Sequence, residues 1–246
     1  SAIDLGTDQQ RAVDAMVAES VRFTPFLLHG VTGSGKTEVY LRAAAAVIAR
    51  HRQVLVLVPE IALTPQFIAR IENTIGGRLV VLHSQMSAGE RHRAWWAASA
   101  GLADVVLGTR LAVLAPFKAL GLVIVDEEHD LSYKQQDGFR YHARDVAVKR
   151  AQVAQVPVVL GSATPSLESI ANVHRGRYQL LSLPERAGGA QMPRVRLLDL
   201  SAMPAAEGLS PPVVKALARR LDRGEQSILY VNRRGFAPVV GCSACG

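Results

Sequence analysis

Short hydrophobic runs recur along the first 190 residues, and helical segments separate most of them. The runs show almost no polar alternation, which is typical of strands that are buried on both faces of a sheet. We predict strands at residues 26–29, 54–58, 79–82, 104–107, 122–125, 156–160 and 178–181. This alternation favours an α/β fold, in which helices cover both faces of a parallel sheet.

The helices between these runs carry signals of their own. Residues 37–50 are rich in alanine, and isoleucines recur at spacings of three and four within residues 65–75. A Ser-Ala-Gly-Glu capping box predicts the start of a third helix, which ends at Ala100. Trp95 and Trp96 are neighbours on that helix and face different ways, so we expect at least one of them in the core.

The amino-acid composition of the chain changes at residues 184–193, where glycine, proline and arginine predict a linker. Beyond it the pattern predicts a strand, a helix and a strand, at residues 194–200, 211–222 and 227–231. This second part is too small to bury a sheet by itself. We therefore expect residues 1–190 to form one domain and residues 191–246 to begin another.

The charge adds a basic surplus to this picture. Lysine and arginine number 28 against 21 acidic residues, which gives a formal net charge of +7. Residues 215–234 hold six basic and two acidic side chains, and so contribute +4 of it. Such a surplus suits a polyanionic partner such as nucleic acid, although a solvated helix face would give the same pattern.

Cysteine usage and hydropathy bear on the compartment. Cys242 and Cys245 are the two cysteines, and they offer no disulfide framework. No apolar run reaches membrane-spanning length, and no signal peptide stands at the start. We expect a cytoplasmic protein with no membrane partner, and the end just after a Cys-x-x-Cys pair indicates a chain cut within a motif.

One eight-residue segment matches the phosphate-binding P-loop, G-x-x-x-x-G-K-[ST], between a predicted strand and a predicted helix. Its glycines let backbone N–H groups curl around phosphate oxygens, and the helix N-terminus adds partial positive charge. We expect Lys36 to reach the β- and γ-phosphates and the Thr37 hydroxyl to bind Mg²⁺. The alternative is an accidental glycine-rich turn. The predicted ATP·Mg²⁺ site comprises Gly30, Val31, Thr32, Gly33, Ser34, Gly35, Lys36 and Thr37.

An acidic pair follows the predicted strand at residues 122–125. Asp126 at the end of a buried strand can hold Mg²⁺, and Glu127 can orient and deprotonate an attacking water. An acidic turn alone would be a weak signal, but a P-loop stands about ninety residues upstream. We therefore predict Lys36, Asp126 and Glu127 as the catalytic residues.

The chain also resembles a known helicase family. Its ordered motifs are similar to those of superfamily 2 DExH helicases: the P-loop, Pro59–Thr64, Gly108–Arg110, Asp126–His129 and Gly161–Pro165. Longer stretches, such as Val-Pro-Glu-Ile-Ala-Leu-Thr-Pro-Gln and Asn-Arg-Arg-Gly-Phe-Ala-Pro, resemble bacterial replication-restart helicases over nearly the whole chain.

This resemblance implies a fold, an activity and partners. Residues 1–190 would be the RecA-like, ATP-binding first lobe of the motor, and residues 191–246 the start of its second RecA-like lobe. The protein would be an ATP-dependent 3′→5′ DNA helicase, a hydrolase that restarts replication and assembles the primosome. Its partners would be single-stranded and forked DNA, other primosome proteins and single-strand DNA-binding protein, in the cytoplasm at the nucleoid.

The resemblance also assigns roles near the nucleotide. Gln9 falls where the family reads adenine, with Gln10 as the neighbouring candidate, although glutamine at a helix start often only caps the helix. His129 and the segment Ser162-Ala163-Thr164 would couple the nucleotide state to the grip on DNA.

Several residues fall where the family contacts the DNA backbone, namely Pro59, Thr64, Thr109 and Arg110. A simpler interpretation is that Pro59 ends a strand and Thr64 caps a helix. Residues 130–142 interleave aromatic and basic side chains, as in the aromatic-rich loop of replication-restart and RecQ-like helicases. Phe139 and Tyr141 could instead anchor that loop in the core. We predict DNA contacts in the loop by Tyr133, Lys134, Phe139, Arg140 and Tyr141.

Cys242 and Cys245 correspond, by the same resemblance, to the first pair of a zinc-binding insertion. A zinc site takes about four ligands, so this pair is half a site, and Zn²⁺ is expected in the full-length protein. The motif that carries the arginine finger is not in this sequence, and such a finger is worth ~10³–10⁵ in rate. We therefore expect the fragment to bind ATP·Mg²⁺ but to hydrolyse it poorly.

Two other functions remain open from the sequence. The protein could be a non-enzymatic scaffold that recognises forks and loads a helicase, with ATP as a switch. It could also be a small-molecule P-loop kinase, although the strand-end Asp-Glu-Glu-His and the basic aromatic loop speak against this. Stimulation of ATP hydrolysis by single-stranded DNA would distinguish these classes.

Overall fold

The computed structural model describes residues 4–19, 22–186, 194–200 and 209–230. The chain divides into two compact units, Ser1–Gln191 and Met192–Gly246. The assignment of the second unit as the beginning of a second motor lobe stays a prediction. Cys242 and Cys245 lie outside the described residues.

The first unit contains a seven-stranded sheet, whose strands pair in parallel in the order β3–β4–β2–β5–β8–β1–β9. The central strands are buried along their length, as their continuous hydrophobic runs predict. This confirms the predicted parallel α/β fold. The strands are β1 Pro25–Gly30, β2 Gln53–Leu57, β3 Leu79–Leu82, β4 Val105–Gly108, β5 Leu120–Val125, β8 Val158–Ser162 and β9 Gln179–Leu183.

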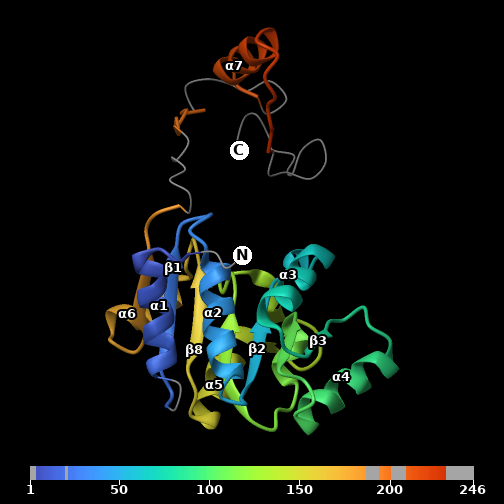
Figure 1. Cartoon of the computed structure of the whole chain (residues 1–246). Helices are drawn as coiled ribbons and strands as arrows, with labels where there is room; N and C mark the ends of the chain where they lie inside the picture. The colour runs from blue at the N-terminus through green and yellow to red at the C-terminus, as the bar shows by residue number, and fades with distance from the viewer. Residues whose placement is uncertain (1–3, 20–21, 187–193, 201–208, 231–246) are drawn as a thin grey trace, which may run out of the picture. The chain divides into compact units, whose positions relative to one another are not determined.

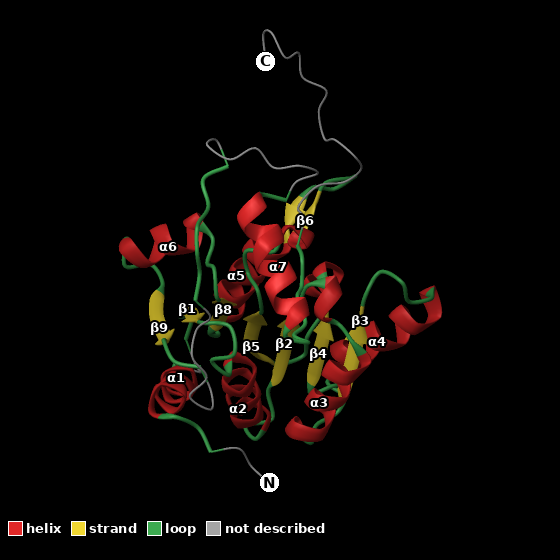
Figure 2. Ribbon diagram, turned by 90° about the horizontal axis from the view of Figure 1, so that it is seen from above, coloured by secondary structure: helices red, strands yellow, loops and turns green. Residues whose placement is uncertain are grey.

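Helices cover both faces of this sheet (Figures 1 and 2). On one face α1 (Thr7–Ala18), α2 (Lys36–Ile48) and α3 (Pro65–Ile75) enclose one hydrophobic cluster. On the other, α4 (Ala88–Ala100) and α5 (Ala143–Ala154) enclose a second cluster, which α5 enters through alanines. The shorter helix α6 spans Leu167–His174, and three 3-10 turns span Glu60–Ala62, Arg110–Leu114 and Leu131–Tyr133.

The strand order brings three segments together at one edge of the sheet. β5, β8 and β1 are neighbours, and the carboxyl ends of parallel strands meet at the same edge. β1 leads into the P-loop, β5 into Asp126, and β8 ends at Ser162. A hairpin of β6 (Lys134–Gln135) and β7 (Tyr141–His142) follows β5.

Two predicted strands in the second unit are wrong. Residues 194–200 and 227–230 have no strand geometry, and Leu197 and Ile228 are 92% and 98% exposed. A strand is stable only when a neighbour takes up its backbone hydrogen bonds, and hydrophobic alternation cannot show whether that neighbour exists. The predicted helix is confirmed as α7, Pro211–Asp222, which starts with two prolines in its first turn.

The expectation of a core tryptophan is also wrong. Trp95 and Trp96 are 38% and 58% exposed, and α4 instead buries Ala94 and Ala98. The small side chains face the sheet, so the bulky ones are left at the surface. Within the part of the chain that the structure describes, no helix is both long and apolar enough to cross a membrane.

Candidate nucleotide and nucleic-acid site

The P-loop turns from β1 into α2 with two glycines in the left-handed region. Gly33 and Gly35 have φ of +81° and +82°, which side chains rarely adopt. Lys36 is the first residue of α2, and its Nζ donates a hydrogen bond to the Gly30 carbonyl at 3.0 Å. The same Nζ lies 4.0 Å from Glu127 Oε1. The lysine amine thus lies between the loop and the end of β5.

Gln9 lies directly against this loop. Its Nε2 donates to the Ser34 carbonyl at 2.8 Å, and its Oε1 accepts from the Gly6 backbone N–H at 2.8 Å. A Cβ at Gly35 would fall 2.3 Å from Gln9 Nε2, so the contact requires glycine there. Gln10 instead donates to Asp14 on the exposed side of α1. Of the two candidate glutamines, Gln9 is the one beside the loop.

Asp126 follows β5 and is held from two sides. The Tyr40 hydroxyl donates to its Oδ1 at 3.0 Å, and the Tyr133 hydroxyl donates to its backbone carbonyl at 2.7 Å. Burial, and then the charge of Glu127, raise the pKa of Asp126 to about 6, whereas the Tyr40 hydrogen bond and Lys36 oppose this rise. Ionising a carboxylate in the interior costs free energy, which is why its pKa rises. A bound cation offsets this cost, so Asp126 is suited to bind one.

Glu127 and His129 connect β5 to the end of β8. Glu127 adopts φ of +44°, and its Oε2 lies 3.6 Å from His129 Nδ1. The same nitrogen lies 2.7 Å from Ser162 Oγ, and His129 Nε2 lies 3.4 Å from Thr164 Oγ1. The predicted coupling residues are therefore in contact, with Ala163 between the two hydroxyl residues.

The donor set fits a nucleotide with Mg²⁺. Ser34 Oγ is buried within the loop and has no hydrogen-bond partner among the described residues. The left-handed glycines, the start of α2 and Lys36 form a cradle suited to phosphate. Thr37, the next helical residue, and Asp126 supply the hydroxyl and carboxylate oxygens that Mg²⁺ prefers.

The residues predicted to contact the DNA backbone differ in their exposure to solvent. Pro59 is buried, and Thr109 is 3% exposed. Thr64 is exposed, but its hydroxyl accepts from the Phe67 N–H as the N-cap of α3, as the simpler interpretation proposed. Arg110 donates to the carbonyls of two loop residues, Ser132 at 2.9 Å and Lys134 at 3.1 Å. Arg110 thus holds the start of the loop at residues 130–142 in place.

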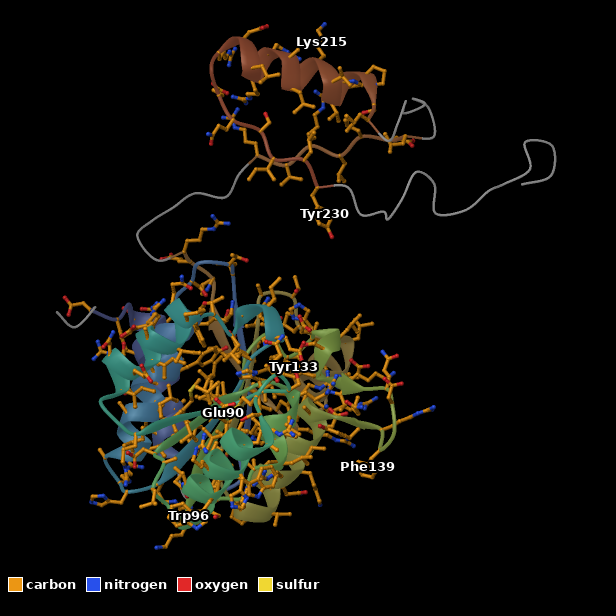
Figure 3. The ribbon with its side chains drawn as sticks, turned by 90° about the vertical axis from the view of Figure 1, so that its right-hand side faces the viewer. Glu90, Trp96, Tyr133, Phe139, Lys215 and Tyr230 are labelled. Atoms are coloured by element: carbon orange, nitrogen blue, oxygen red, sulfur yellow. The ribbon has the colours of Figure 1, made fainter. Side chains whose placement is uncertain are left out.

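Within residues 130–142, hereafter the aromatic-basic loop, the prediction for Tyr133 requires correction. Tyr133 is fully buried and donates to the Asp126 carbonyl, so its ring cannot stack on a base in this structure. Phe139 is 82% exposed at the outer edge of the domain, whereas Tyr133 lies inside it (Figure 3). The Phe139 and Tyr141 rings lie 6.1 Å apart, and Lys134 and Arg140 are exposed.

The sequence interpretation missed two groups of residues. Tyr40 lies one helical turn after Lys36, so the spacing of four could have indicated that both reach the same site. A Cβ on Gly161 would fall 1.5 Å from the Tyr40 hydroxyl oxygen, so that glycine makes room for it. The second group surrounds Glu128 and comes from the starts of two helices, with Arg144 in α5 and Ser166 and Ser169 at α6.

Metal ligands are not clustered elsewhere in the described residues, where no group of three or more His, Cys, Asp or Glu side chains could hold an ion. The predicted Zn²⁺ pair, Cys242 and Cys245, lies beyond these residues, so its role stays a prediction.

The fold and this site define a helicase motor domain, and the family model of the DEAD/DEAH box helicases matches residues 7–173. The chain belongs to that family.

Within this family, the chain is similar in sequence to replication restart proteins. The chain is 48% identical to the replication restart protein PriA of Haemophilus influenzae over 91% of its own length and 31% of the relative's. It is 44% identical to PriA of Bacillus subtilis over 98% of its length and 31% of the relative's. The chain therefore spans about a third of these curated relatives.

Solved structures show the same fold at low identity. RecG bound to a three-way DNA junction has a TM-score of 0.59 at 22% identity, over 91% of this chain and 29% of RecG. The helicase MrfA bound to DNA has a TM-score of 0.53 at 17% identity, over 74% of this chain and 27% of MrfA. Both support the RecA-like helicase fold.

Proposed function

We propose that this chain is part of an ATP-dependent 3′→5′ DNA helicase that acts in replication restart and primosome assembly. The observation that carries the proposal is the convergence of Lys36, Asp126, Glu127 and the His129–Ser162 contact at one edge of the sheet. Family membership supports the helicase activity, and similarity to the PriA proteins supports the role in restart.

Each residue at this edge has a proposed task. A bound Mg²⁺ ion would supply positive charge that stabilises the negative charge developing on the phosphates. Lys36 binds the β- and γ-phosphates, and Thr37 and Asp126 hold the metal ion. Glu127 orients the attacking water and accepts its proton. Gln9 is proposed to recognise the adenine base, and its contact with the loop through Ser34 supports this role.

Coupling to DNA would run through the aromatic-basic loop and the His129–Ser162–Thr164 contacts. The exposed Phe139 offers a stacking surface, and Lys134 and Arg140 offer phosphate contacts beside it. Tyr141 supports the Phe139 ring. Arg110 and the buried Tyr133 hold this loop against the catalytic strand end.

The proposed partners are single-stranded and forked DNA, other primosome proteins and single-strand DNA-binding protein, in the cytoplasm at the nucleoid. Zn²⁺ bound by Cys242, Cys245 and further ligands of the full-length protein completes the proposal. By themselves the 246 residues, about a third of the relatives' length, are proposed to bind ATP·Mg²⁺ and to hydrolyse it slowly.

The test measures ATP hydrolysis by the full-length protein with and without single-stranded DNA. We expect DNA to stimulate hydrolysis in the wild type, and Lys36→Ala to lower the stimulated rate by at least about a hundredfold, because a major phosphate contact is lost. Arg11→Ala, on the exposed side of α1, is the matched control and should hydrolyse at the wild-type rate. A wild type that DNA does not stimulate would contradict the proposal.

The scaffold function remains the second candidate, since Lys134, Phe139 and Arg140 of the aromatic-basic loop form an exposed surface that a partner could bind. A scaffold that uses ATP only as a switch would support replication restart without hydrolysis. Glu127→Gln keeps the nucleotide contacts of Lys36 and removes the proposed base. Retention of restart activity by this variant would favour the scaffold, and loss of it would favour the helicase.

A further inference from the structure

Glu128 is the fully buried member of the acidic run after β5, although its neighbours Glu127 and His129 are partly exposed. Its Oε1 accepts from the Ser166 backbone N–H at 2.7 Å. Its Oε2 lies 3.0 Å from both Ser166 Oγ and Ser169 Oγ. A carboxylate with this many donors is held in one position, since leaving any of them unpaired in the interior is costly.

Arg144 completes the surroundings of this carboxylate. Its Nη1 lies 3.1 Å from Glu128 Oε2 and 2.8 Å from Ser166 Oγ, and its Nε donates to Asp145 at 2.9 Å. The Arg144 side chain is 11% exposed. It is the second residue of α5, which begins directly after β7. Arg144 therefore fixes the returning strand of the aromatic-basic loop to the catalytic strand end.

The same carboxylate also holds the start of α6. Ser166 is the N-cap of that helix, four residues after Ser162. Glu128 thus joins three elements: the end of β5, the exit of the Ser162–Thr164 segment, and the base of the loop.

This junction lies beside a strained residue. Glu127 adopts φ of +44°, a conformation that persists when the surrounding structure enforces it. The peptide group that follows Glu127 is fixed at both of its polar atoms, because the Glu128 N–H donates to the Gly161 carbonyl at 3.0 Å and the Glu127 carbonyl accepts from the Asp130 N–H at 2.8 Å. The buried Glu128 side chain adds a third anchor next to Glu127.

On the basis of the proposed function, we propose that Glu128 and Arg144 are positioning residues of the motor. They orient Glu127 for its work on the attacking water, and they transmit the position of the aromatic-basic loop to it. Their loss should lower the DNA-stimulated kcat and leave the KM for ATP unchanged, because neither side chain contacts the P-loop in this structure.

The test compares the full-length wild type with Glu128→Gln, Arg144→Met and the double variant. Removing one member of a buried ion pair leaves an unpaired charge, whereas removing both does not. The midpoint of thermal unfolding should therefore fall in Arg144→Met and recover in the double variant. The stimulated kcat should fall at least about tenfold in all three, because a small misplacement of the base is costly.

Two further variants complete the design. Arg150→Met is the matched control, since Arg150 belongs to the same helix but contacts Val113 and the Phe117 ring, and its stimulated kcat should equal that of the wild type. Ser169→Ala removes one donor from Glu128 without changing any charge, and should lower the stimulated kcat about threefold with the fold intact.

The outcomes separate this inference from the proposed function. A wild type that single-stranded DNA does not stimulate contradicts the proposed function, and the inference with it. If DNA stimulates the wild type, and the double variant matches the wild type in both thermal stability and stimulated kcat, the inference alone is contradicted. The inference would also be overturned if the two single variants Ser169→Ala and Glu128→Gln both showed the stimulated kcat of the wild type.

Discussion

Replacement of Asp126 by asparagine should stabilise the protein in the absence of nucleotide and metal ions. In the folded protein, burial and the charge of Glu127 raise the pKa of this carboxyl from 3.8 to about 6. The carboxylate therefore destabilises the fold wherever it is ionised. Asparagine keeps an oxygen that can accept the hydrogen bond from the Tyr40 hydroxyl, at 3.0 Å in the wild type, and removes the charge.

The magnitude follows from linkage. A rise of the pKa from 3.8 to about 6 corresponds to about 3 kcal/mol, at about 1.4 kcal/mol for each pH unit. Asp126 is partly accessible to water, which screens part of this cost, so we expect about 1–2 kcal/mol. Because the folded pKa is the higher one, the stability from this group is full below pH 3.8 and is lost as the pH rises through about 6.

The assay is thermal unfolding in EDTA at a series of pH values. At pH about 7.5 the midpoint of Asp126→Asn should exceed that of the wild type by about 2–8 °C, and the two should converge near pH 4. Asp104→Asn is the control with the opposite sign, since hydrogen bonds from Arg78 lower the pKa of Asp104. An Asp126→Asn variant that is less stable than the wild type at neutral pH would refute the reasoning.

Three further predictions concern stability and DNA binding. Tyr133→Ala should lower the free energy of unfolding by about 3–5 kcal/mol, whereas Phe139→Ala should keep the stability and weaken single-stranded DNA binding by about 1–3 kcal/mol; equal losses of stability would contradict this. Gly161→Ala should lower the stability measured in urea by about 1–3 kcal/mol, because its Cβ would meet the Tyr40 hydroxyl, and an unchanged midpoint would argue against this contact. Ser87→Ala should cost about 1 kcal/mol through the lost capping box of α4, with ATP hydrolysis unchanged.

Local signals predicted the elements whose patterns are self-contained. α3 and β3 lie at the predicted residues, because isoleucine spacing defines the first and an uninterrupted apolar run defines the second. α5 was not predicted. It enters the core through Ala143, Ala147 and Ala151, and small residues within a charged segment give almost no hydrophobic periodicity.

The same distinction applies to the site. The P-loop and the Asp126–Glu127 pair are contiguous motifs, so their chemistry is readable from the sequence. The burial of the Tyr133 side chain depends on how its loop folds back on Asp126. The junction at Glu128 joins residues 16 to 41 positions apart, and no local pattern indicates it. Contacts between elements that are distant in the sequence decide these features, and no local sequence pattern records such contacts.

The most direct test of the account is DNA unwinding by the full-length protein with ATP·Mg²⁺, on duplexes that carry a single-stranded tail at either the 3′ or the 5′ end. We predict that the wild type unwinds the 3′-tailed duplex faster than the 5′-tailed one, and that Glu127→Gln binds ATP and DNA but unwinds neither. Unwinding by Glu127→Gln at the wild-type rate, or no unwinding by the wild type, would contradict the account.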